Sequence, residues 1–122
     1  MSDSIDRLYR AVCEAGEERP ALSRTARLRG EGVNKMAKKV AEEAAEVAIE
    51  AVTGAREGLI RESADLIYNL AVLWSATGVS PEDVYAEMDR RERLYGIAQK
   101  LPKSAAGEQS EETAPLARQT AR

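Results

Sequence analysis

Histidine and phenylalanine are absent from this 122-residue chain, and cysteine occurs only once. The absence of histidine excludes Ser-His-Asp and Cys-His catalysis, imidazole metal ligands and a Glu-x-x-His di-iron site. A single cysteine cannot form a disulfide within the chain or a Cys-rich zinc site. Any bound metal must therefore be held by oxygen ligands, which suits hard cations such as Mg²⁺, Mn²⁺ or Ca²⁺.

Aromatic residues and an excess of positive charge are also lacking. Aromatics make up 4% of the chain, and 18 Lys and Arg stand against 21 Asp and Glu, for a formal net charge of −3. A stacking platform for single strands and a basic surface for duplexes are therefore not expected, which argues against a nucleic-acid partner. No apolar run approaches the roughly 18 residues of a membrane span, and residues 1–4 lack the pattern of a secretion signal. We expect a cytoplasmic protein without membrane contact.

Apolar residues recur at helical spacing along most of the chain, and no segment alternates as a strand does. This pattern predicts an all-α domain of four to five helices over residues 1–103, followed by a disordered polar tail over 104–122. Helices are expected at about 3–15, 35–53, 57–77 and 81–98, while 23–32 fits a short helix or a loop. We expect Asn34 to cap the second long segment, Gly54 and Gly78 to end helices, and Ser80-Pro81 to start one.

Two of these helices carry acidic residues inside their apolar stripes. At about 100° per residue, Glu43 points into the middle of one stripe and Glu46 lies on its edge. In the next helix Glu62 occupies the centre of the stripe, Asp65 flanks it, and Asn69 lies two turns further along the same line. The stripes consist of Met36, Val40, Val47 and Ala51 in the first helix and of Leu59, Leu66, Leu70 and Leu73 in the second.

Carboxylates that converge between two helices repel one another, and burial makes each charge more costly. A divalent cation would neutralise them, because acids spaced i, i+3 lie close enough to share an ion. Two simpler explanations are a solvated acidic face and local ion pairs. Lys39 could reach Glu43 and Arg61 could reach Asp65, which would neutralise part of the acidic charge.

Segments 38–47 (KKVAEEAAEV) and 61–70 (RESADLIYNL) resemble the phosphoribosyl-ATP pyrophosphohydrolase family of the all-α nucleotide pyrophosphohydrolase (MazG-like) superfamily. The resemblance covers about residues 5–95. The superfamily signature, Glu-Glu-x-x-Glu followed by Glu-x-x-Asp, is matched by Glu42, Glu43, Glu46, Glu62 and Asp65.

This resemblance implies Mg²⁺-dependent hydrolysis of the α–β phosphoanhydride of phosphoribosyl-ATP, the second step of histidine biosynthesis, in homodimers or larger homo-oligomers. Mn²⁺ is a possible substitute for Mg²⁺. The implied metal ligands are Glu43, Glu46, Glu62 and Asp65, and Glu42 is the implied acid that orients the attacking water. The candidates for binding the substrate phosphates are Lys35, Lys38, Lys39 and Arg27.

The sequence departs from the family pattern at three positions. Ala41 stands where glycine is usual, Asn69 where histidine is usual, and Arg24 replaces the tyrosine of a Ser-Tyr-Thr segment. Asn69 could hold a water or a sugar hydroxyl, or it could be a satisfied polar core residue. These departures leave two alternatives open: a divergent pyrophosphatase for another nucleoside polyphosphate, and a non-catalytic helical interaction module.

Overall fold

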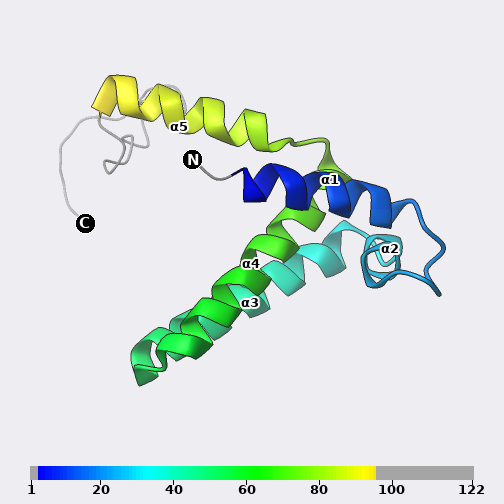
Figure 1. The fold of residues 1–122 in the computed structure, drawn as a ribbon, viewed down its shortest axis with the longest axis horizontal. Helices are drawn as coiled ribbons and strands as arrows, with labels where there is room; N and C mark the ends of the chain where they lie inside the picture. The colour runs from blue at the N-terminus through cyan, green and yellow to red at the C-terminus, as the bar shows by residue number, and fades with distance from the viewer. Residues whose placement is uncertain (1–2, 96–122) are drawn as a thin grey trace. The chain divides into compact units, whose positions relative to one another are not determined.

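The computed structural model describes residues 3–95, in which all regular secondary structure is helical (Figure 1). The helices are α1 (Ser4–Gly16), α2 (Arg24–Gly30), α3 (Val33–Thr53), α4 (Arg56–Thr77) and α5 (Pro81–Tyr95). The all-α prediction is confirmed for these residues, and the segment over 23–32 proves to be a short helix. The predicted end of the last helix near residue 98 and the predicted tail over 104–122 lie outside the described residues.

The chain divides into two compact units, residues 1–81 and 82–122. The first unit holds α1 to α4 and every residue predicted to be functional. Helix α5 starts at Pro81, the last residue of the first unit, and continues into the second with acidic residues in its first turn, as the sequence predicts. Within α5, hydrogen bonds from Arg90 and Arg91 to the Glu87 carboxylate lower the pKa of Glu87 to about 2.

In the first unit, α3 and α4 form an antiparallel hairpin and lie side by side along their lengths (Figure 1). Gly54 and Gly78 end the two helices in the left-handed conformation, each at a φ of 78°, which confirms both predicted ends. The prediction of Asn34 as the cap of α3 is wrong. The helix already begins at Val33, because Gly32, at a φ of 98°, takes the cap position and leaves Asn34 inside the first turn.

The core lies where α1 and α2 pack against the hairpin. Its buried cluster consists of Val12, Leu28, Met36, Ala71 and Val72. The apolar stripes of α3 and α4 are only partly covered: Val40 and Val47 are half-buried, and Ala51 is exposed, contrary to its predicted place in a buried stripe.

Several large apolar side chains on the hairpin remain open to solvent. On α3, Ile49 is 53% and Val52 is 87% exposed; on α4, Ile60 is 53% and Ile67 is 38% exposed. Isolated apolar residues are normal on a surface, but with Val33 of α3, which is 47% exposed, five such residues lie on one hairpin of a small domain. They point to a surface that a partner could cover. No helix within residues 3–95 is both long and apolar enough to cross a bilayer.

Candidate active site

Three carboxylates meet where α3 and α4 face each other. Glu43 of α3 and Glu62 and Asp65 of α4 each place one oxygen within 4.8 Å of the other two. We call this group the acidic cluster. Glu43 and Glu62 are half-buried and Asp65 is exposed, so the cluster is open to solvent on one side. The hairpin thus brings together residues that are 22 positions apart in the sequence.

The electrostatics of the acidic cluster favour a proton or a cation. The pKa of Glu62 is raised, first by desolvation, then by a hydrogen bond with Glu43 and by the charges of Glu43, Asp65 and Glu46. Such a carboxyl gives up its proton reluctantly unless a positive charge comes close. The donor set consists of carboxylate oxygens alone, so it fits a hard divalent cation such as Mg²⁺.

Two further predicted site residues lie on the exposed side of α3. Glu46 is exposed and outside the acidic cluster, yet near enough to Glu62 for its charge to raise that pKa. Glu42 is exposed and also outside the cluster of three.

Asn69 lies one turn beyond Asp65 on α4 and is 1% exposed. Its Nδ2 donates a hydrogen bond to the backbone oxygen of Asp65 at 2.9 Å. Its buried Oδ1 has no hydrogen-bond partner among residues 3–95. Asn69 is therefore satisfied on one side only, and an acceptor is left for a water or a hydroxyl group.

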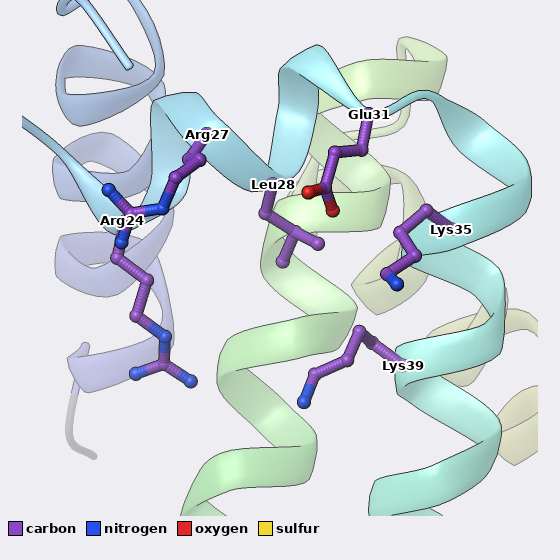
Figure 2. Close-up of a pocket in the computed structure, with 6 residues that line it drawn as sticks. All are labelled: Arg24, Arg27, Leu28, Glu31, Lys35 and Lys39. Atoms are coloured by element: carbon purple, nitrogen blue, oxygen red, sulfur yellow. The ribbon is translucent and has the colours of Figure 1, made fainter. Parts of the chain in front are cut away.

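A pocket of about 170 Å³ lies beside α4, between α2 and the start of α3 (Figure 2). We call it the basic pocket. It is lined by Arg24, Arg27, Leu28, Glu31, Lys35 and Lys39. Three of the four predicted phosphate-binding residues are thus brought together. Lys38 is exposed and does not line the pocket.

The basic pocket and the acidic cluster share a contact. Lys39 Nζ lies 3.7 Å from Glu43 Oε2, and the two side chains are 31% and 15% exposed. This ion pair was one of the simpler explanations for the acids, and it neutralises only one of them. The other pair, Arg61 with Asp65, does not form within the described part of the chain.

Arg24 was not among the predicted site residues, yet it lines the basic pocket, where one contact of its own and one of each neighbouring residue position it. Ser23 caps α2 by accepting a hydrogen bond from the backbone N–H of Ala26 at 3.0 Å. Thr25 Oγ1 and the Tyr68 hydroxyl are hydrogen-bonded at 2.6 Å. The Arg24 guanidinium carbon lies 4.9 Å from the centroid of the Tyr68 ring, a cation–π distance.

The family model described as phosphoribosyl-ATP pyrophosphohydrolase matches residues 5–92, a range that includes both the acidic cluster and the basic pocket. The chain belongs to this family. Two curated relatives named phosphoribosyl-ATP pyrophosphatase 2 are closely similar. The one from Rhodopseudomonas palustris is 66% identical over 107 residues, which is 88% of this chain and 82% of the relative. The one from Bradyrhizobium diazoefficiens is 63% identical over 105 residues, covering 86% of this chain and 78% of the relative.

More distant relatives carry the same activity in their names. A phosphoribosyl-ATP pyrophosphatase of Gluconobacter oxydans is 50% identical over 105 residues, covering 84% of this chain and 79% of the relative. Membership in the phosphoribosyl-ATP pyrophosphohydrolase family confirms the resemblance seen in the sequence.

Proposed function

We propose that this chain is a Mg²⁺-dependent phosphoribosyl-ATP pyrophosphohydrolase that releases pyrophosphate and leaves phosphoribosyl-AMP. The observation that carries the proposal is the contact between an acidic cluster suited to a divalent cation and a pocket lined by four cationic side chains. Triphosphate hydrolysis needs both, because a metal and fixed cations offset the negative charge of the phosphates. The names of the relatives supply the substrate.

Glu43, Glu62 and Asp65 would hold the metal, and Glu46 lies near enough to join them. When bound, Mg²⁺ supplies Lewis-acid polarisation of phosphate oxygens and lowers the pKa of bound water. Glu42, exposed beside this set, accepts a proton from the attacking water and orients it.

The remaining side chains bind the substrate. Lys35, Lys39 and Arg27 hold phosphate oxygens in the basic pocket. Arg27 is itself anchored, because its Nη1 donates a hydrogen bond to the Pro20 carbonyl at 3.0 Å. The unpartnered Oδ1 of Asn69 accepts a hydrogen bond from a water or a sugar hydroxyl near the acidic cluster.

The active form is a homodimer or a larger homo-oligomer. The exposed apolar residues of α3 and α4, with Val52 and Ile49 foremost, support this proposal. A second copy would complete the half-covered stripes of the hairpin and remove these side chains from water.

A substrate panel tests the proposed function. Purified protein is offered phosphoribosyl-ATP and, separately, plain nucleoside triphosphates, each with Mg²⁺ and with EDTA, and pyrophosphate release is measured. We expect Mg²⁺-dependent release from phosphoribosyl-ATP. Turnover of a plain triphosphate without turnover of phosphoribosyl-ATP would identify a pyrophosphatase for another nucleotide. No release from any nucleotide would leave the non-catalytic interaction module as the explanation.

A further inference from the structure

We propose that Arg24 is a substrate-binding residue whose guanidinium, placed over the Tyr68 ring, holds the phosphate groups that leave as pyrophosphate. This inference rests on the proposed function and deepens it. In the sequence pattern, Arg24 is the residue that replaces the tyrosine of the Ser-Tyr-Thr segment. The replacement therefore adds a cation to the basic pocket that the family pattern does not supply.

The surroundings of Arg24 fix its position before substrate arrives. The Ser23 cap sets the start of α2, and the bond between Thr25 and the Tyr68 hydroxyl ties that helix to α4. The guanidinium carbon then lies over the Tyr68 ring, 4.9 Å from its centroid. A side chain held in this way loses less conformational entropy on binding than a free surface arginine does.

Arg24 is also available to an anion. Lys39 pairs with Glu43 and Arg27 donates one hydrogen bond to the Pro20 carbonyl, so each keeps its remaining donors for phosphate. Within residues 3–95, Arg24 makes no ion pair, and its recorded contact is the ring of Tyr68. A cation–π contact uses none of the guanidinium N–H groups in a hydrogen bond, and these groups match the oxygens of a phosphate in a bidentate arrangement.

Position along the helices indicates which phosphates Arg24 meets. Tyr68 follows Asp65 by three residues on α4, and Lys39 precedes Glu43 by four on α3, so each lies one helical turn from the acidic cluster. The basic pocket therefore begins within one turn of the proposed metal site. Its volume of about 170 Å³ is below the roughly 300 Å³ of pockets that enclose whole ligands. It suits the β- and γ-phosphates rather than a base or a sugar.

The experiment compares Arg24→Gln with Arg24→Lys and with Arg10→Gln, an exposed arginine of α1 outside the basic pocket. Calorimetry in the presence of Mg²⁺ measures the affinity of each protein for pyrophosphate and for AMP, the latter as a ligand with a single phosphate. Arg24→Gln should weaken pyrophosphate binding about tenfold, as the loss of a charge-assisted hydrogen bond does, and leave AMP binding unchanged. Arg24→Lys keeps the charge but not the paired N–H donors of a guanidinium, so its affinity for pyrophosphate should lie between those of Arg24→Gln and the wild type. Arg10→Gln should match the wild type.

Two results would overturn the assignment. Unchanged pyrophosphate affinity in Arg24→Gln, with a lower melting temperature, would mean that Arg24 only supports Tyr68. A loss of AMP affinity with pyrophosphate affinity unchanged would place Arg24 at the other end of the substrate. Because the readout is pyrophosphate binding, the assignment stands or falls separately from turnover of phosphoribosyl-ATP, which tests the proposed function.

Discussion

Lys39 Nζ lies 3.7 Å from Glu43 Oε2, and this single contact joins the basic pocket to the acidic cluster. The two residues are one turn apart on α3, so the helix itself fixes the boundary between a cationic and an anionic region. A triphosphate and its metal need these two regions side by side. Substrate phosphate and Glu43 can both contact the Lys39 ammonium group, which has three donors.

Substitution of Lys39 should therefore weaken substrate binding more than substitution of its neighbour. We expect Lys39→Met to raise the KM for phosphoribosyl-ATP about tenfold, because a charged hydrogen-bond donor leaves the pocket. Lys38→Met is the matched control, since Lys38 has the same chemistry but lies outside the pocket. Steady-state kinetics of both variants check this. Equal effects from the two lysines would show that only the general positive charge of this turn matters.

Removal of one carboxylate from the acidic cluster should abolish turnover and leave the fold intact. Glu43→Gln and Asp65→Asn keep the size of the side chain but lose an anionic ligand. We expect each substitution to lower the turnover rate by more than the 10- to 100-fold that is typical when a residue hydrogen-bonded to a metal ligand is lost. Glu57→Gln, on the same hairpin but outside the cluster, should retain activity. Pyrophosphate release and circular dichroism measure both properties. A near-normal rate in either cluster variant would contradict the proposed ligand set.

The raised pKa of Glu62 predicts how stability depends on pH without metal. The folded chain holds the Glu62 proton to higher pH than the unfolded chain, whose carboxyl titrates near 4.5. Between the pKa of Glu62 in the unfolded chain and its higher pKa in the folded chain, the folded state binds more protons. The stability of the fold therefore falls as pH rises through this range. Glu62→Gln removes this loss.

Melting temperatures in EDTA across pH 4 to 7 test this. The melting temperature of Glu62→Gln minus that of the wild type should grow with pH. Addition of Mg²⁺ at neutral pH should reduce or reverse the difference, because only the wild type keeps all the carboxylates that hold the ion. A difference in melting temperature that does not change with pH would show that ionisation of Glu62 does not destabilise the folded state.

The exposed face of the hairpin should control assembly. Val52→Glu places a charge on the most exposed large apolar residue of α3, and we expect it to shift the protein toward monomer. Leu22→Glu is the control, because Leu22 is 64% exposed but precedes α2 in a loop. Sedimentation velocity at several concentrations measures both. An unchanged oligomeric state in Val52→Glu would place the interface elsewhere.

The sequence predicted the helices, and that Glu43, Glu62 and Asp65 meet, because helical periodicity governs both; Glu46, predicted with them, lies outside the group of three. Glycine at 54 and 78 adopts a conformation that ends helices, and helical periodicity placed Glu43, Glu62 and Asp65 on facing stripes. The same rules misplaced the start of α3. Asn34 is a good capping residue, but Gly32, which tolerates a φ of 98°, takes the cap position two residues earlier.

The role of Arg24 was out of reach of local rules. Helix α2 has seven residues, too few for a periodic pattern, and the contact that defines Arg24 is with Tyr68, 44 residues away. Arg24 was visible in the sequence only as a departure from a motif. The fold turns that departure into a position beside Lys35 and Lys39 in the basic pocket.

Phosphorus NMR of a complete reaction tests most directly whether the protein cleaves the α–β bond of phosphoribosyl-ATP at the acidic cluster. With Mg²⁺, the wild-type protein should convert phosphoribosyl-ATP into pyrophosphate and phosphoribosyl-AMP in equal amounts. With EDTA, or with Glu43→Gln, the substrate should persist. Orthophosphate with phosphoribosyl-ADP as the products, or equal turnover by Glu43→Gln, would contradict the claim.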